Sequence, residues 1–210
     1  MSCLAAEAQL HDMYNANATT LAPLEYHGYD DMKCDDAIAR MQYYNATTTP
    51  TMAFDGTVTD QPYTAWPSIF TARKAVKSPL KIELTVKLTG NNFEATAKIT
   101  RGGTVPDTNL KLRFAVTEDG LVANGTTFNT VLRKMYPNAT GTAITLPAAE
   151  TKEFKVTGAL NSSWKKDKLH YIVWVQNDGT KEVYQTKLLK ADEITDLNTP
   201  TMADVRGMYR

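Results

Sequence analysis

The strongest constraint on the fold of this chain is a pattern of alternating apolar and polar residues that begins after Pro79. Successive side chains of a strand point to opposite faces, so a period of two predicts strands with one buried face. Repeated strands of this kind are typical of an antiparallel, immunoglobulin-like β-sandwich. The pattern occupies residues 80–88, 93–99, 110–116, 154–156, 169–176 and 183–189.

The part of the chain before Lys77 has a different pattern, which is mainly helical. Its helices are expected in stretches with good helix formers or with a proline suited to the first helical position. Short strands are expected where β-formers stand between turn residues. The expected helices cover residues 3–15, 35–44 and 67–76, and the expected strands cover 21–27 and 51–54.

The change of pattern at residues 77–79 marks the predicted domain boundary. We expect an α+β protein with an N-terminal domain over 1–77 and a β-sandwich over 79–190. Residues 191–210 are polar and unpatterned, so a mobile tail is predicted there.

The dipeptide Thr49-Pro50 stands directly before the expected strand 51–54. A proline cannot donate a ladder hydrogen bond, so it belongs at the first position of a strand. A Thr-Pro bond is cis at a cost of about 0.5–1 kcal/mol. In the cis form it would expose the Thr49 amide and carbonyl to an incoming peptide. An ordinary loop proline is the alternative.

The chain has two cysteines, Cys3 and Cys34. Cys3 lies in the first turn of the first expected helix, where the helix dipole favours a thiolate. Cys34 precedes the second expected helix. A disulfide between them requires Cα atoms within about 7 Å, and two free thiols are the alternative.

Charge and hydropathy exclude several classes of protein. The 23 basic and 23 acidic residues leave no basic excess, so nucleic acid is not an expected partner. No apolar run approaches the roughly 20 residues of a membrane-spanning helix. His11, His27 and His170 show no metal-ligand spacing, so neither a metal nor another cofactor is expected.

Four aspartates surround the start of the second expected helix. Carboxylates there complement the positive end of the helix dipole. The alternative is a hard cation such as calcium, although the spacing fits no calcium loop. The four residues are Asp30, Asp31, Asp35 and Asp36.

The abrupt start at Met1 suggests that an upstream segment has been removed, either by processing or by design of the expressed chain. A mild excess of glycosylation sequons favours an extracytoplasmic protein, and a chain simply rich in Asn and Thr is the alternative. The sequons begin at Asn17, Asn45, Asn124, Asn138 and Asn161.

The order of the N-terminal elements resembles the thioredoxin fold. The segments that carry this resemblance are CLAAEA at 3–8, LEYH at 24–27 and YYNATTTPT at 43–51. With the sandwich behind them, the whole chain resembles a family of secreted thioredoxin-like proteins known in bacteria as outer-membrane proteins. VLRKMYP at 131–137 and VWVQN at 173–177 are similar to the sandwich of that family.

The resemblance implies a role for Cys3 and a truncated fold. Thioredoxin-like proteins exchange disulfides through a Cys-x-x-Cys motif. Cys3 corresponds to its second, resolving cysteine, while the attacking cysteine and the first strand would lie upstream. Two strand edges would then stay open and recruit another segment or a second copy of the chain.

Two functions follow from the resemblance. The first is thiol–disulfide exchange in the cell envelope, with Cys3 as the catalytic thiol, Cys34 as a candidate second thiol and Thr49-Pro50 positioning the substrate. Its partners would be protein or peptide thiols and disulfides, and activity would be weak with one motif cysteine. The alternative is a non-catalytic binding or structural protein on the same scaffold.

Overall fold

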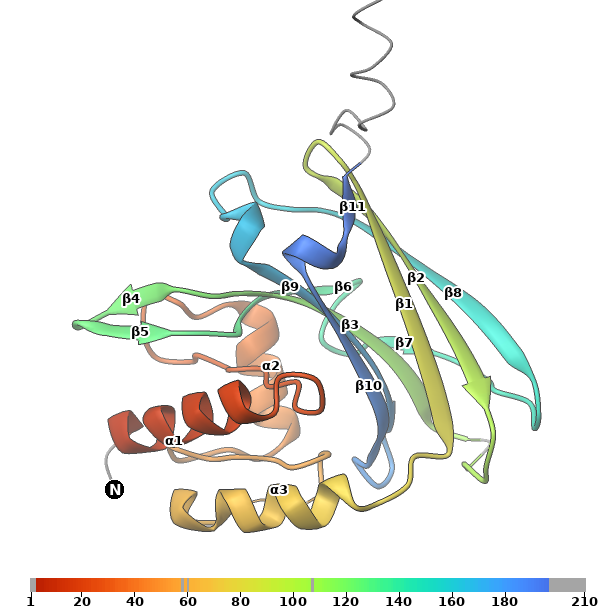
Figure 1. The fold of residues 1–210 in the computed structure, drawn as a ribbon, viewed down its shortest axis with the longest axis horizontal. Helices are drawn as coiled ribbons and strands as arrows, with labels where there is room; N and C mark the ends of the chain where they lie inside the picture. The colour runs from red at the N-terminus through yellow and green to blue at the C-terminus, as the bar shows by residue number, and fades with distance from the viewer. Residues whose placement is uncertain (1–2, 58, 60, 107, 197–210) are drawn as a thin grey trace, which may run out of the picture.

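Two β-sheets form the centre of the protein in this computed structural model (Figure 1). The structure describes residues 3–57, 59, 61–106 and 108–196. One sheet has the strand order β11-β1-β2-β8, and the other has the order β10-β9-β3-β6 with the short β7 paired to β3. The first comprises β1 (Leu80–Thr89), β2 (Asn92–Arg101), β8 (Thr151–Ala159) and β11 (Thr195–Asp196). The second comprises β3 (Leu110–Glu118), β6 (Val131–Tyr136), β7 (Thr142–Ala143), β9 (Leu169–Asn177) and β10 (Val183–Lys190).

The sheets face each other across one hydrophobic core, which explains the alternating pattern of the sequence. In β1 every second residue is buried, from Leu80 to Leu88, because only one face of the strand meets the core. Neighbouring strands in both sheets are antiparallel except for the pairing of β1 with β11. A separate two-stranded ribbon joins β4 (Leu121–Ala123) to β5 (Thr126–Phe128).

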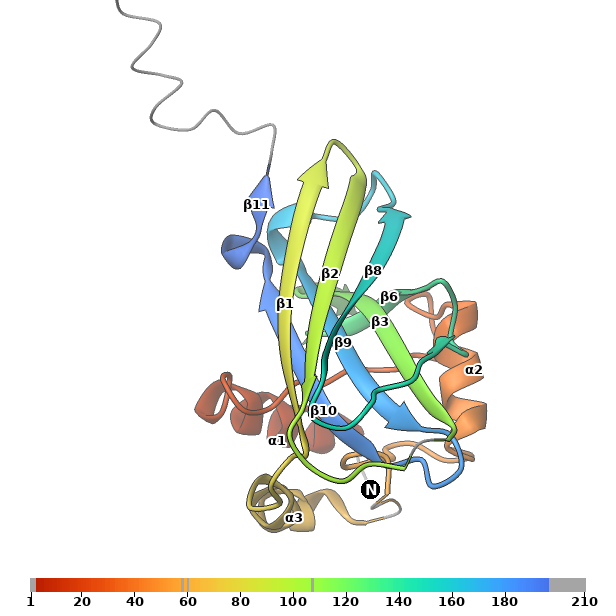
Figure 2. The same ribbon diagram turned by 90° about the vertical axis from the view of Figure 1, so that its right-hand side faces the viewer.

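Strand β9 is buried along its whole length because both of its faces are covered. Tyr171, Val173 and Val175 point into the sandwich core. Ile172 and Trp174 lie on the opposite face, in a cluster that includes Ala37 of helix α2 (Asp35–Tyr43). Figure 2 shows α2 on the side of this sheet away from β1, β2 and β8.

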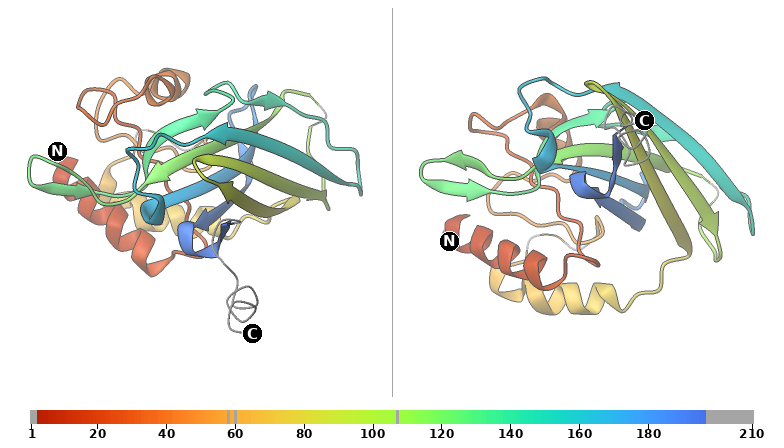
Figure 3. Two further views of the ribbon diagram at one scale, coloured as in Figure 1. Left: turned by 90° about the horizontal axis from the view of Figure 1, so that it is seen from above. Right: turned by 45° about the horizontal axis from the view of Figure 1, so that its top comes forward.

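Two further helices form a layer beside the sheets. Helices α1 (Cys3–Ala16) and α3 (Trp66–Lys74) lie next to each other in the views of Figure 3, with the short η1 (Tyr63–Ala65) before α3. Their contact is a second hydrophobic cluster that unites apolar residues of α1, α3 and the intervening chain. It contains Ala6, Leu10, Met13, Phe54, Trp66 and Phe70.

The prediction of a thioredoxin-like α/β domain, lacking its first strand, over residues 1–77 is wrong. The three helices form, but the described residues of 1–77 form no strand ladder. The extended segments give their hydrogen bonds to the sandwich instead of to each other. The Glu25 amide donates to Thr130 at 3.0 Å, and Leu132 donates back to Glu25 at 2.9 Å. Similarly, Val183 donates to the Asp55 carbonyl at 2.9 Å.

The predicted mobile tail, residues 191–210, is only partly described. Residues 191–196 form the turn η3 (Ala191–Glu193) and strand β11, which pairs with β1 through Lys87 and Leu88. Residues 197–210 of that prediction lie outside the described residues. The chain also contains η2 (Lys166–Lys168), which leads into β9.

Candidate functional site

A groove of about 1500 Å³ separates the pair of helices α1 and α3 from the sandwich. We call it the helix–sheet groove. Its walls come from α1, from the segments 18–30 and 46–56, from α3 and from β10. The apolar cluster between α1 and α3 supplies much of its lining, including Leu10, Phe54 and Trp66. Concave, mostly apolar surfaces with a few convergent polar groups are the usual form of a binding site.

Two stretches of extended backbone line the groove without forming a sheet. Among the described residues, the backbone groups of Leu24 and Tyr26 take part in no hydrogen bond, and neither do those of Met52 and Ala53. Because all four residues line the groove, their N–H and C=O groups are available to a bound strand. Unpaired backbone of this kind is a template for strand addition.

Three residues singled out from the sequence come together at one end of the helix–sheet groove. The Cys3 thiol lies 3.7 Å from the Thr49 hydroxyl, and Pro50 follows in a cis peptide bond with Thr49. All three residues line the groove, and Cys3 is exposed. The structure therefore places the head of α1 beside the Thr-Pro element.

Cys34 lies elsewhere, and it forms no disulfide with Cys3. Both thiols are free. The Cys34 thiol is half-buried and donates to the Leu132 carbonyl over 3.6 Å. Burial raises the pKa of this thiol, and the charge of Asp36 raises it further. Cys34 does not line the groove, so it is not brought to the Cys3 end of it.

A cluster of carboxyl groups occupies the wall of the groove one helical turn from Cys3. Glu7 of α1 and Glu25 of the facing segment share a hydrogen bond. Burial raises the pKa of Glu7 to about 8, with further contributions from the charge of Glu25 and from this hydrogen bond. Burial likewise raises the pKa of Glu25.

His27 is the cationic partner in this carboxyl cluster. Its Nδ1 lies 2.6 Å from Asp30, and its Nε2 lies 3.5 Å from Glu25. Burial alone lowers the pKa of His27, but the hydrogen bonds to the two carboxylates outweigh burial and raise it. One imidazolium thus faces three carboxyl groups: Glu7, Glu25 and Asp30.

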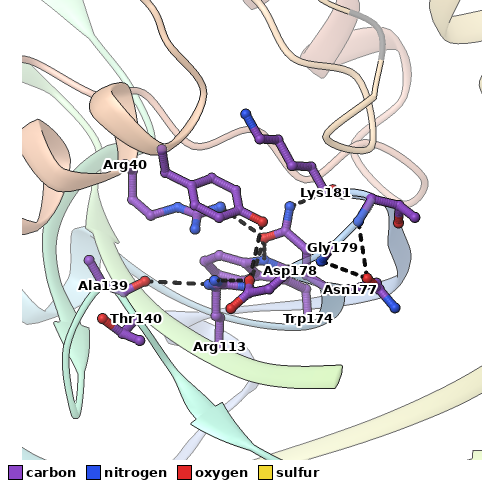
Figure 4. Close-up of polar contacts among 12 residues, drawn as sticks. Arg40, Arg113, Ala139, Thr140, Trp174, Asn177, Asp178, Gly179 and Lys181 are labelled. Carbon is purple, nitrogen blue, oxygen red and sulfur yellow. Dashed lines mark hydrogen bonds and ion pairs between the residues drawn. The ribbon is translucent and has the colours of Figure 1, made fainter. Parts of the chain in front are cut away.

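A buried polar network positions α2 against β9, close to the groove (Figure 4). The guanidinium groups of Arg40 and Arg113 both donate to the side-chain oxygen of Gln176. Arg113 also pairs with Asp178, while Arg40 lies over the rings of Tyr43 and Tyr44. Both arginines are 1% exposed. The network is structural, because neither guanidinium lines the groove.

Two of the four aspartates near α2 form separate contacts. Asp36 accepts hydrogen bonds from the backbone amides of Met135 and Ala139, at 2.8 and 3.0 Å. Asp30 pairs with His27, as described above. Within the described part of the chain, no three His, Cys, Asp or Glu side chains are grouped as metal ligands. In the same residues, no helix is long and apolar enough to cross a membrane.

Sequence reasoning missed the carboxyl cluster and the arginine network. His27 was considered only as a metal ligand and rejected as one, and nothing in the spacing of Glu7 and Glu25 indicates a contact. A usable signal was the Glu-x-His-x-x-Asp order of residues 25–30, which puts two carboxylates within reach of one imidazole. For Arg40, the signal was its place three residues after Ala37, which puts it on the buried side of α2.

The chain was compared with protein families and with known proteins. The family model described as "Outer membrane protein Omp28" matches residues 37–193. HBP35 of Porphyromonas gingivalis has a similar structure, with a TM-score of 0.64 and 14% sequence identity over 80% of this chain. The match spans 60% of the length of HBP35, and at this identity it is a likeness of fold.

A second similar structure is a domain of the outer membrane lipoprotein Omp28, also from Porphyromonas gingivalis. It is 17% identical and has a TM-score of 0.42, and the match covers 58% of this chain and 92% of that domain. No curated protein matches the chain.

Proposed function

This chain belongs to the Omp28 family of outer membrane proteins, and we propose that it binds an extended polypeptide segment in its helix–sheet groove. The family is one of the cell envelope, so the protein is extracytoplasmic. The bound segment would run between residues 24–26 and 52–53 as an added strand. This is a binding function that requires no catalysis.

The observation that carries the proposal is the unpaired backbone on both sides of the groove. Leu24 and Tyr26 offer hydrogen-bonding groups from one segment, and Met52 and Ala53 offer them from the other. Strand addition uses such groups for affinity, while alternate side-chain pockets give specificity. The apolar cluster of α1 and α3 would cover every second side chain of the bound strand.

A substitution that fills the groove tests this proposal. Ala22 lines the groove and is only partly buried, so Ala22→Trp narrows it without opening the core. Ala148 is exposed in a loop that does not line the groove, which makes Ala148→Trp a matched control. The probes are labelled peptides of alternating apolar and polar residues, and binding is measured by fluorescence anisotropy.

We expect saturable binding to the natural chain and to Ala148→Trp. Ala22→Trp should bind at least about tenfold more weakly, which corresponds to a loss of about 1.4 kcal/mol. Absence of saturable binding to the natural chain would contradict the proposal, and so would equal affinities for all three proteins.

Thiol–disulfide exchange at Cys3 is the second candidate function. It is supported by the position of the exposed Cys3 thiol at the end of the groove, 3.7 Å from the Thr49 hydroxyl. The Cys3 thiolate would attack a disulfide of the bound segment, form a mixed disulfide and release the other sulfur as a thiolate. Because Cys34 does not line the groove, the reaction would stop at the mixed disulfide.

Mass spectrometry of the intact protein distinguishes this second function. After incubation with a peptide disulfide at neutral pH, the natural chain and Cys34→Ser should each gain one half of the disulfide. Cys3→Ser should gain none. An adduct on Cys34 in preference to Cys3, or no adduct at all, would remove the thiol function and leave the binding function standing.

A further inference from the structure

We infer that the segment bound in the helix–sheet groove carries a lysine or arginine, whose charged group is received between Glu7 and Glu25. This inference rests on the proposed binding function and names the chemistry of the partner. Its starting point is the position of two carboxyl groups that line the groove from facing elements, Glu7 from α1 and Glu25 from the segment 21–27.

The carboxyl groups of this site have too little positive charge around them. Among the described residues, Glu7 and Glu25 form an ion pair with no lysine or arginine. His27 is the one cation in contact with Glu25, and it is shared with Asp30. Asp119 adds negative potential at Glu25 from the direction of the sandwich. A cation arriving from the groove would complete the pairing.

The charge state of Glu7 reflects the same deficit. The pKa of Glu7 is raised to about 8, mainly by burial and then by the Glu25 carboxylate, while the charge of His27 opposes this shift. At neutral pH Glu7 is therefore protonated to a greater extent than an exposed glutamate. An ammonium or guanidinium group placed beside it favours the ionised form, so binding would release that proton.

The position of the pair suits the side chain of a strand rather than a free ion. Glu7 lies one helical turn after Cys3, and Glu25 lies between Leu24 and Tyr26, whose backbone groups are unpaired. A strand hydrogen-bonded beside Leu24 and Tyr26 would direct alternate side chains toward α1, where Glu7 lies. The basic residue and the backbone would therefore be recognised together.

The experiment compares two peptides that differ at one position. One has a central lysine, and the other has norleucine, which keeps the aliphatic stem and lacks the charge. Both are measured by fluorescence anisotropy against the natural chain, Glu7→Gln and Asp12→Asn. Asp12 is exposed on the same helix and does not line the groove, so Asp12→Asn is the matched control.

For the natural chain and Asp12→Asn, we expect the lysine peptide to bind about tenfold more tightly than the norleucine peptide. This preference should grow between about pH 6 and about pH 9, because Glu7 ionises in that interval and lysine stays charged. In Glu7→Gln the preference should fall to about twofold, and its pH dependence should weaken to the part that comes from His27, whose pKa is raised by its two carboxylate partners.

Each other outcome overturns the inference in a recognisable way. Equal affinity for both peptides would contradict the inference of a basic side chain and would leave the proposed binding function intact. Binding of neither peptide would remove both. A dimer of the chain in sedimentation that Ala22→Trp dissociates would identify a second copy of the chain as the occupant in place of a basic segment.

Discussion

The side chains of Arg40 and Gln176 are joined by a hydrogen bond of 2.9 Å between a guanidinium nitrogen and the amide oxygen. The same oxygen accepts hydrogen bonds from Arg113 at 3.0 Å and from the Trp174 indole at 3.3 Å. A neutral amide is thus the common acceptor of two buried cations, and it links α2 to the outer face of β9.

Removing this acceptor should destabilise the protein strongly. In Gln176→Ala, Arg40 and Arg113 lose a shared buried partner, and we expect the free energy of unfolding to fall by about 2–4 kcal/mol. Gln42→Ala is the control, because Gln42 is an exposed glutamine in α2, the helix that carries Arg40. Urea unfolding measures both. A loss below about 1 kcal/mol in Gln176→Ala would show that the arginines do not depend on Gln176.

Asp36 should stabilise the junction of α2 with β6 through its two backbone hydrogen bonds. We expect Asp36→Ala to lower the free energy of unfolding by about 1–3 kcal/mol, because the amides of Met135 and Ala139 lose a charged acceptor. The neighbouring Asp35 is exposed, so Asp35→Ala should change stability by less than about 0.5 kcal/mol. Equal effects of the two substitutions would indicate a general helix-dipole effect instead.

The stability of the protein should fall as pH rises through the titration of Glu7. The pKa of Glu7 is raised from 4.5 in the unfolded chain to about 8 in the folded protein, so the folded state retains a proton over this interval. The stabilisation is complete below about pH 4.5 and is lost as pH rises through about 8.

Glu7→Gln removes this dependence, because glutamine carries no proton to lose. At about pH 9 we expect the free energy of unfolding of the variant to exceed that of the natural chain by about 1 kcal/mol, after allowance for the solvent exposure of Glu7. Urea unfolding measures this difference. At about pH 5 the two should be alike. Asp12→Asn serves as the control on the same helix. A variant less stable than the natural chain at alkaline pH would contradict the burial of Glu7.

The two thiols should react at different rates. Cys3 is exposed at the head of α1, whereas Cys34 is half-buried and its pKa is raised by burial. A thiol-reactive aromatic disulfide should therefore modify Cys34→Ser at least about tenfold faster than Cys3→Ser at neutral pH. The release of the coloured thiolate is followed by absorbance. Comparable rates would place Cys34 in solvent.

The sandwich could be predicted from the sequence because the pattern of apolar residues within each strand shows which of its faces are buried. Leu80 to Leu88 alternate cleanly, since one face of β1 meets the core and the other meets solvent. Strand β9 shows less alternation because α2 covers its second face, yet its unbroken apolar run still identified a strand. Local pattern was sufficient in both cases.

The N-terminal part could not be derived in the same way, because pairing depends on a partner. The residues around Leu24 and Met52 have the composition of strands, but nothing in them specifies which backbone they will bond. Glu25 pairs with the start of β6 and with Thr130 just before it, more than 100 positions later. Periodicity therefore predicted the helices, but it assigned to a separate sheet two segments that hydrogen-bond to the sandwich instead.

The candidate site could not be predicted from single elements. Cys3 and Thr49 were selected through the thioredoxin resemblance, and although that fold is wrong here, the Cys3 thiol and the Thr49 hydroxyl lie 3.7 Å apart. The contact of Glu7 with Glu25 depends on the packing of α1 against a distant segment. Arg40 would ordinarily be assigned to the surface, and only its hydrogen bonds to Gln176 of β9 and to Tyr44 explain its burial.

Hydrogen exchange of individual backbone amides, measured with and without a saturating lysine-bearing peptide, tests most directly whether a strand enters the helix–sheet groove. We predict that the amides of Leu24, Tyr26, Met52 and Ala53 gain protection on binding, because they have no hydrogen-bond partner among the residues that the structure describes. The exposed edge strand β8 should be unaffected. Protection confined to β8, or unchanged exchange at all four groove amides under saturation, would contradict the account.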